Sequence, residues 1–204
     1  MDDKDALANS FQVYQDFIVA EYNYMADAAH QAQENRVRCS EYFIVVISSF
    51  ITAIFAFRTS GGPNASAEYS QIFALLFLII FVIGACNILQ LCKLRLAWHE
   101  SVMAMNDIKE GLIQAAPGIA PLFAWRKGTV LHSFKPFSIS FILAVQISFL
   151  SGIAFAAFIY FCYQSKGDKI LTTSLVATAV IVMVVLLFLY SAPLIKENAK
   201  NSVV

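Results

Sequence analysis

Cysteines and histidines are the residues of this chain best suited by type to catalysis or metal binding. The chain has four cysteines and three histidines: Cys39, Cys86, Cys92, Cys162, His30, His99 and His132. No two cysteines have the C-x-x-C spacing of a zinc or redox site, and the histidines are scattered singly. We therefore expect no catalytic residue, no metal site and no cofactor, and a protein that is not an enzyme.

The sequence also lacks the motifs that are typical of proteins that bind nucleotides or nucleic acids. The sequence contains no glycine-rich phosphate loop, no nucleophile elbow and no basic groove lined with aromatic residues. We therefore expect no direct contact with nucleic acid, and the features that remain concern the membrane.

Composition places the chain in a bilayer. Of its 204 residues, 59% are hydrophobic and 14% are charged, whereas a soluble domain usually has about a quarter charged residues. Four apolar segments have the length of a transmembrane helix, roughly 17–25 residues, or nearly so. They are residues 42–57, 72–91, 137–163 and 171–195. The sequence predicts an all-α, four-span transmembrane protein whose surroundings are the lipid bilayer.

The distribution of Lys and Arg predicts the orientation. With a cytoplasmic N-terminus, only three of the 14 Lys and Arg residues fall on the outer side, at Arg58, Lys166 and Lys169. Cations collect on the cytoplasmic side of membrane proteins. We therefore expect both termini to be cytoplasmic.

The helices of the first two spans are expected to run on beyond the membrane, because no Gly or Pro interrupts 1–60 or 85–110. Apolar residues alternate at spacings of three and four in both extensions, as in a coiled coil. The proposed seam contains Met25, Ala28, Trp98, Met105 and Ile108, with Met25 opposite Ile108 and Ala28 opposite Met105. This pairing predicts a cytoplasmic antiparallel helical stalk. The alternative is that one or both segments lie flat on the membrane.

A group of cations is expected where the stalk meets the bilayer. Arg36, Arg38, Lys93 and Arg95 would lie at one level and form a collar against anionic lipid headgroups. The following stretch, 116–136, is broken by prolines and glycines but is too apolar for a free loop. We expect it at the inner interface, with Trp125 at headgroup level.

Polarity inside the predicted spans is mild. No Asp, Glu, Lys, Arg or His lies near the centre of a span, which argues against active transport. The polar residues that we single out there are Ser48, Thr52, Asn87 and Gln146. Such residues are more often contacts between helices than the lining of a pore.

Small residues form one face of the third span. Ala144, Ser148, Gly152 and Ala156 recur every four residues, and such a face lets two helices approach closely. The face serves packing within the monomer or contact between subunits, and the sequence leaves both open.

These features divide the chain into five segments. Residues 1–41 form an N-terminal cytoplasmic amphipathic helix, and 42–91 form the first transmembrane hairpin. Residues 92–136 form a cytoplasmic helix and interfacial segment, 137–195 the second transmembrane hairpin, and 196–204 a cytoplasmic tail.

The run ENRVRCSEYF before the first span, and the run KLRLAWHESVMAMNDIKE that continues the second, resemble small bacterial membrane proteins of the SLATT type. In that group a helix, two spans and a further helix are regarded as membrane-perturbing effectors in phage defence and nucleotide-signal systems. The resemblance covers residues 10–112, and this chain departs from it by a second pair of spans. Four-span defence subunits with a separate cytosolic partner fit equally. The resemblance implies a multi-pass protein of the bacterial inner membrane.

Two classes of function therefore stand, with a third as a weaker alternative. The first is a homo-oligomeric membrane effector, pore-forming or membrane-perturbing, that is regulated through its cytoplasmic helices. The second is a non-conducting anchor or scaffold for a cytosolic protein partner. The third is a small-solute facilitator.

Overall fold

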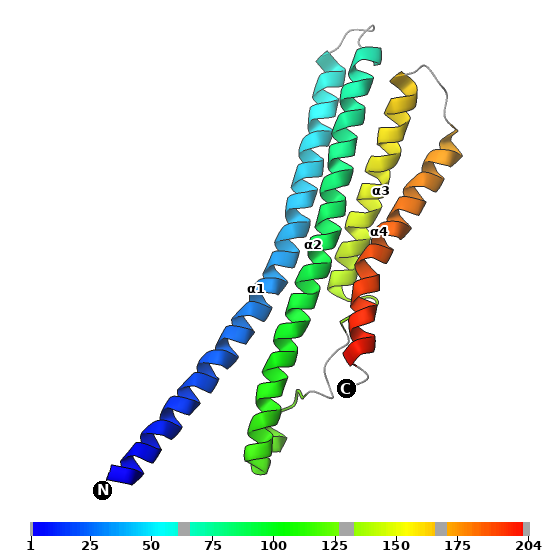
Figure 1. Cartoon of the computed structure of the whole chain (residues 1–204). Coiled ribbons are helices and arrows are strands. Elements are labelled where there is room, and N and C mark those ends of the chain that lie inside the picture. Colours follow the sequence, from blue (N-terminus) through cyan, green and yellow to red (C-terminus); the bar gives the residue numbers. More distant parts are fainter. Residues whose placement is uncertain (1, 61–65, 127–132, 166–170, 202–204) are drawn as a thin grey trace. The chain divides into compact units, whose positions relative to one another are not determined.

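The chain folds into four long helices. The computed structural model describes residues 2–60, 66–126, 133–165 and 171–201, and no strand occurs among them. The helices are α1 (Asp2–Ser60), α2 (Ser66–Ala115), α3 (Ile139–Ser165) and α4 (Thr172–Asn201), and a 3-10 helix, η1 (Pro117–Leu122), follows α2 (Figure 1). The predicted all-α fold is confirmed.

Each long helix contains a candidate membrane span. In the described part of the chain, four helical segments are long and apolar enough to cross a bilayer: Gln12–Ala56, Tyr69–Ala115, Ile139–Gln164 and Thr172–Ala199. A helix is the natural form for such a segment, because it satisfies its backbone hydrogen bonds internally where no water is present. The predicted four-span architecture is therefore confirmed. The first two helices also run well beyond the length of one span, as expected.

The start of α3 differs slightly from the predicted boundary. The third span was expected from Phe137, but Phe137 has a φ of 61°, outside the helical region, and its side chain is 85% exposed. Ser138 caps the helix instead, since its Oγ accepts a hydrogen bond from the backbone N–H of Phe141 at 3.3 Å. This cap satisfies one of the backbone donors that a helix N-terminus leaves open.

The chain divides into two compact units. Unit 1 consists of Met1–Asn35 and Leu94–Ser133, and unit 2 consists of Arg36–Lys93 and Phe134–Val204. Helices α1 and α2 each contribute one segment to unit 1 and another to unit 2. Unit 1 therefore contains the residues of the predicted stalk and the stretch that follows α2.

Aromatic rings join α2 to α3 in unit 2. The ring centroids of Phe73 and Phe77 lie 5.4 Å and 5.6 Å from that of Phe161, and Phe81 lies 4.7 Å from Phe155. These separations are typical of favourable ring pairs. Other side chains of the unit are fully buried, namely Phe43, Ile80, Ile88, Leu91, Ile147, Tyr190 and Leu194.

In unit 1 the antiparallel segments of α1 and α2 meet through a cation and a ring. Lys109 Nζ lies 5.7 Å from the centroid of the Tyr22 ring. In the predicted register Lys109 would face Tyr24, so the observed contact lies within two residues of it. Ala29 and Ala32 of α1 are buried in the same unit.

Candidate functional site

Polar residues from three helices come together in unit 2. We call this group the polar cluster; its members are Arg36 and Cys39 of α1, Asn87 and Gln90 of α2, and Ser140 of α3. The Arg36 guanidinium donates a hydrogen bond to Ser140 Oγ. The Cys39 thiol donates to Asn87 Oδ1 at 3.1 Å, and Gln90 Oε1 lies 3.6 Å from the same sulfur. The cluster therefore links α1 to both α2 and α3.

The burial of the polar cluster makes its hydrogen bonds important for stability. Arg36 is only 6% exposed, and a buried guanidinium is costly unless its donors find acceptors. Hydrogen bonds between helices in a membrane contribute roughly 0.6–2 kcal/mol each. The cluster has the chemistry of a packing contact, since its thiol and hydroxyl, on Cys39 and Ser140, are buried and hydrogen-bonded between helices.

The predicted cationic collar is only partly available to lipid. Arg95 is 7% exposed, and its Nε donates to the backbone oxygen of Ser133 at 2.9 Å. Its guanidinium carbon lies 4.4 Å from the centroid of the Trp98 ring. Arg36 is buried in the polar cluster, whereas Arg38 and Lys93 have exposed side chains. Burial makes Arg36 and Arg95 poor headgroup ligands, while headgroup contact by Arg38 and Lys93 stays a prediction.

The small-residue face of α3 is covered within the chain. Ala144, Ser148, Gly152 and Ala156 are all buried. A Cβ atom added at Gly152 would lie 2.5 Å from the carbonyl oxygen of Ala179, so α3 and α4 meet backbone to backbone there. Of the two roles that the sequence left open for this face, the contact at Gly152 is packing within the monomer.

A second close approach was not predicted from the sequence. A Cβ at Gly84 of α2 would lie 1.9 Å from Ser151 Oγ and 3.0 Å from the Phe43 ring. The signal available was a single glycine inside an otherwise apolar run, which often marks close contact. The hydroxyls of Ser148 and Ser151 are both buried and have no hydrogen-bond partner among the residues that the structure describes.

The polar residues singled out in the spans behave differently from one another. Ser48 and Thr52 are exposed, and their hydroxyls donate at 2.8 Å to backbone oxygens one turn earlier in α1. In the described chain, the hydrogen bonds of these two hydroxyls therefore lie within α1 and link it to no other helix. Asn87 belongs to the polar cluster, whereas Gln146 is exposed and has no hydrogen-bond partner in the described ranges.

The most buried positions of unit 1 are not the predicted seam. Met25, Ala28, Trp98, Met105 and Ile108 are only half-buried. Three buried residues, Ala29, His99 and Asn106, lie one position after a seam residue, and Ala32 and Arg95 are buried as well. One residue turns a helix by about 100°, and an apolar count overlooks polar side chains that become buried with partners. The antiparallel pairing thus stands with a different face inside.

The remaining titratable residues of the described ranges include a neighbouring histidine and glutamate on α1. His30 Nδ1 lies 3.8 Å from Glu34 Oε1 one turn along α1, on an exposed surface. Within the described ranges, no three His, Cys, Asp or Glu side chains are grouped so that they would hold a metal ion. Trp125 is exposed, while Lys127 and His132 lie outside the described residues.

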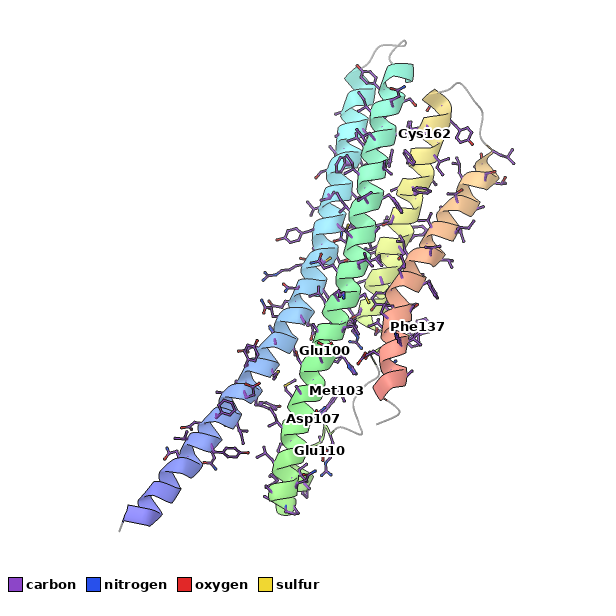
Figure 2. The ribbon with its side chains drawn as sticks, in the orientation of Figure 1. Glu100, Met103, Asp107, Glu110, Phe137 and Cys162 are labelled. Carbon is purple, nitrogen blue, oxygen red and sulfur yellow. The ribbon has the colours of Figure 1, made fainter. Side chains whose placement is uncertain are left out.

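Acidic residues are spaced along one side of the unit 1 segment of α2. Figure 2 labels Glu100, Asp107 and Glu110 on this segment, and separations of three and seven residues place them on the same side of a helix. Glu100 and Asp107 are exposed.

Comparison with protein-family models, with curated proteins and with solved structures found no match to this chain.

Proposed function

We propose that this chain is a homo-oligomeric membrane effector whose spans perturb or open the bilayer when unit 1 changes its arrangement. In this proposal both termini are cytoplasmic, the membrane is the bacterial inner membrane, and the setting is defence. The Lys and Arg distribution supports the orientation. The pattern resemblance to SLATT-type proteins supports the setting.

The observation that carries the proposal is the polar character of the α1–α2 contact in unit 1. Asn106 is 3% exposed, and its Oδ1 accepts a hydrogen bond from Lys109 Nζ at 3.3 Å. The same ammonium group lies over the ring of Tyr22. A cation–π contact of this kind contributes only about 0.5–1 kcal/mol at an exposed site. The cation–π contact alone is thus a weak link between the two segments, and we infer that their arrangement can change, as a switch requires.

The continuity of α1 and α2 supports the same proposal. Each is a single helix that contains both a candidate span and a segment of unit 1. Both helices pass from one unit into the other without a break in their assigned helical structure. A rearrangement in unit 1 would thus act directly on the spans of the same two helices.

Membrane potential in cells expressing the protein tests the proposal. We expect the wild type to depolarise the membrane. Asn106→Leu should reduce this effect, because an apolar contact would favour the resting arrangement. Thr52→Val is a matched control, since the Thr52 hydroxyl bonds only its own helix, and it should depolarise like the wild type. A wild type that is inserted but leaves the potential unchanged would refute the effector.

A non-conducting anchor for a cytosolic protein is the second candidate, and the acidic side of α2 favours it. Glu100, Asp107 and Glu110 would suit a partner with a basic surface. The anchor predicts co-purification of a partner that Glu100→Lys abolishes, with no change in membrane potential. A small-solute facilitator would instead speed osmotic swelling of vesicles without depolarisation.

A further inference from the structure

One polar side chain of α3 lies on a surface that is otherwise apolar. The exposed residues of this surface, which we call the α3 stripe, are Ile139, Ile142, Gln146, Phe149, Ile153 and Tyr160. Apart from Gln146 they are hydrophobic or aromatic and between 43% and 75% exposed. The first five are separated by three and four residues in alternation, and Tyr160 follows seven later. This is the spacing of a helix that packs along a second helix.

Gln146 lies inside the hydrocarbon layer. It is seven residues from Ile139, or about 10 Å along the helix. α3 has 27 residues, about 40 Å, against a hydrocarbon thickness of about 30 Å. Gln146 is therefore roughly 5–10 Å deep, whether α3 is centred in the bilayer or begins at its edge.

An exposed amide at that depth needs a partner. Each unsatisfied polar group in hydrocarbon is costly, and polar residues of membrane helices usually face other helices. Gln146 has no hydrogen-bond partner in the described chain. The opposite side of α3 is already filled, since Gly152 meets the backbone of α4 and Ser151 meets Gly84 of α2. A partner for the amide would thus come from outside the part of the chain that the structure describes.

We propose that the α3 stripe is the contact between two copies of this chain, with Gln146 bonded to Gln146 of the partner subunit. A primary amide has both donors and acceptors, so two glutamines can each donate to the other. Copies inserted in the same direction bring the same residue together about a twofold axis. A single polar position within an apolar heptad sets the register of such a pair. The inference deepens the proposed function, because it places the subunit contact of the oligomer.

Self-association in vesicles of phosphatidylethanolamine and phosphatidylglycerol tests the contact. Full-length copies carry donor or acceptor fluorescent proteins at the C-terminus, and energy transfer is followed as the lipid content rises. Gln146→Leu removes the amide but keeps an apolar residue that lipid solvates well. We expect it to weaken association roughly 3- to 30-fold, the range for one hydrogen bond between membrane helices. Gln146→Asn keeps the amide and should retain most of the transfer.

Photo-crosslinking locates the contact independently. Phe149 lies on the stripe, and Phe188 of α4 is also an exposed phenylalanine, at 54% and 66% exposure respectively. With p-benzoylphenylalanine incorporated at Phe149 we expect a crosslinked dimer, and with the same group at Phe188 we expect monomer. Equal crosslinking at both positions would overturn the proposal.

Other outcomes would overturn it as well. A monomeric wild type at every lipid content would do so. Unchanged association of Gln146→Leu would show that the amide reaches the headgroup layer or bonds another molecule. Association through the stripe without depolarisation would refute the effector and leave this contact standing. If Gln146→Leu depolarises the membrane and associates as strongly as the wild type, the effector stands and this contact is refuted.

Discussion

Replacing Gly152 with alanine tests the close contact of α3 and α4. The added methyl group would lie 2.5 Å from the Ala179 carbonyl oxygen, whereas ordinary contacts begin at 3.4 Å. The two backbones must therefore move apart by about 0.9 Å at this point. Backbone atoms cannot rotate away as the end of a side chain can, so the strain falls on the packing of the whole helix pair.

The cost has two opposing parts. Adding a methylene to a well-packed interior typically costs about 1–3 kcal/mol. Alanine is favoured over glycine in a helix by about 1 kcal/mol. The net loss for Gly152→Ala is thus roughly 0–2 kcal/mol in the free energy of unfolding. Gly111→Ala is the matched control, because nothing lies within 4 Å of its added Cβ. It should stabilise the helix by about 1 kcal/mol.

The informative quantity is the difference between the two variants, since the helix preference is common to both. We expect Gly152→Ala to be less stable than Gly111→Ala by about 1–3 kcal/mol, measured by circular dichroism as detergent-solubilised protein is unfolded with dodecyl sulfate. Amide exchange around Ala179 should rise in the first variant alone. Gly152→Leu should lower stability further without changing the subunit number. Equal stability of the two alanine variants would refute the close contact.

Three further changes test other contacts. Gly84→Ala should be less stable than Gly111→Ala by about 1–3 kcal/mol in the same unfolding assay. Adding Ser151→Ala should restore part of this loss, because the nearest atom is then removed, and no restoration would count against the contact. Cysteines at Tyr22 and Lys109 should be joined within one chain by a bifunctional thiol reagent, seen as a mobility shift on a gel, because the two side chains meet at their ends. Equal crosslinking of pairs half a turn away would contradict the register. Ser140→Ala should cost about 1–3 kcal/mol by removing an acceptor of the buried guanidinium, whereas Ser140→Thr, which keeps the hydroxyl, should cost less; equal losses in dodecyl sulfate titrations would speak against that hydrogen bond.

The four membrane helices follow from the sequence alone. Transfer of a side chain into lipid depends on that side chain, so the apolar segments can be recognised without knowing what packs on them. Lipid then leaves the backbone of such a segment few choices besides a helix. The length of α1 follows in the same way, because no Gly or Pro interrupts 1–60.

The identity of the buried faces was decided by tertiary structure. The sequence predicts that Arg36 is an exposed cation. In the structure it is buried and donates a hydrogen bond to Ser140, which is 104 residues away in the sequence. His99 and Asn106 are buried although Trp98 and Met105, one position earlier, are more apolar. Burial of a polar group depends on partners that lie elsewhere in the chain, and helical periodicity carries no information about them.

The use of the small residues was decided in the same way. A repeat of Ala, Ser and Gly every four residues indicates close approach of another helix and is silent on which helix approaches. The carbonyl oxygen of Ala179 supplies that answer at Gly152. The sequence thus determined where this chain enters the membrane, because hydration is a property of each segment. The structure decided which faces meet, because packing is a property of pairs.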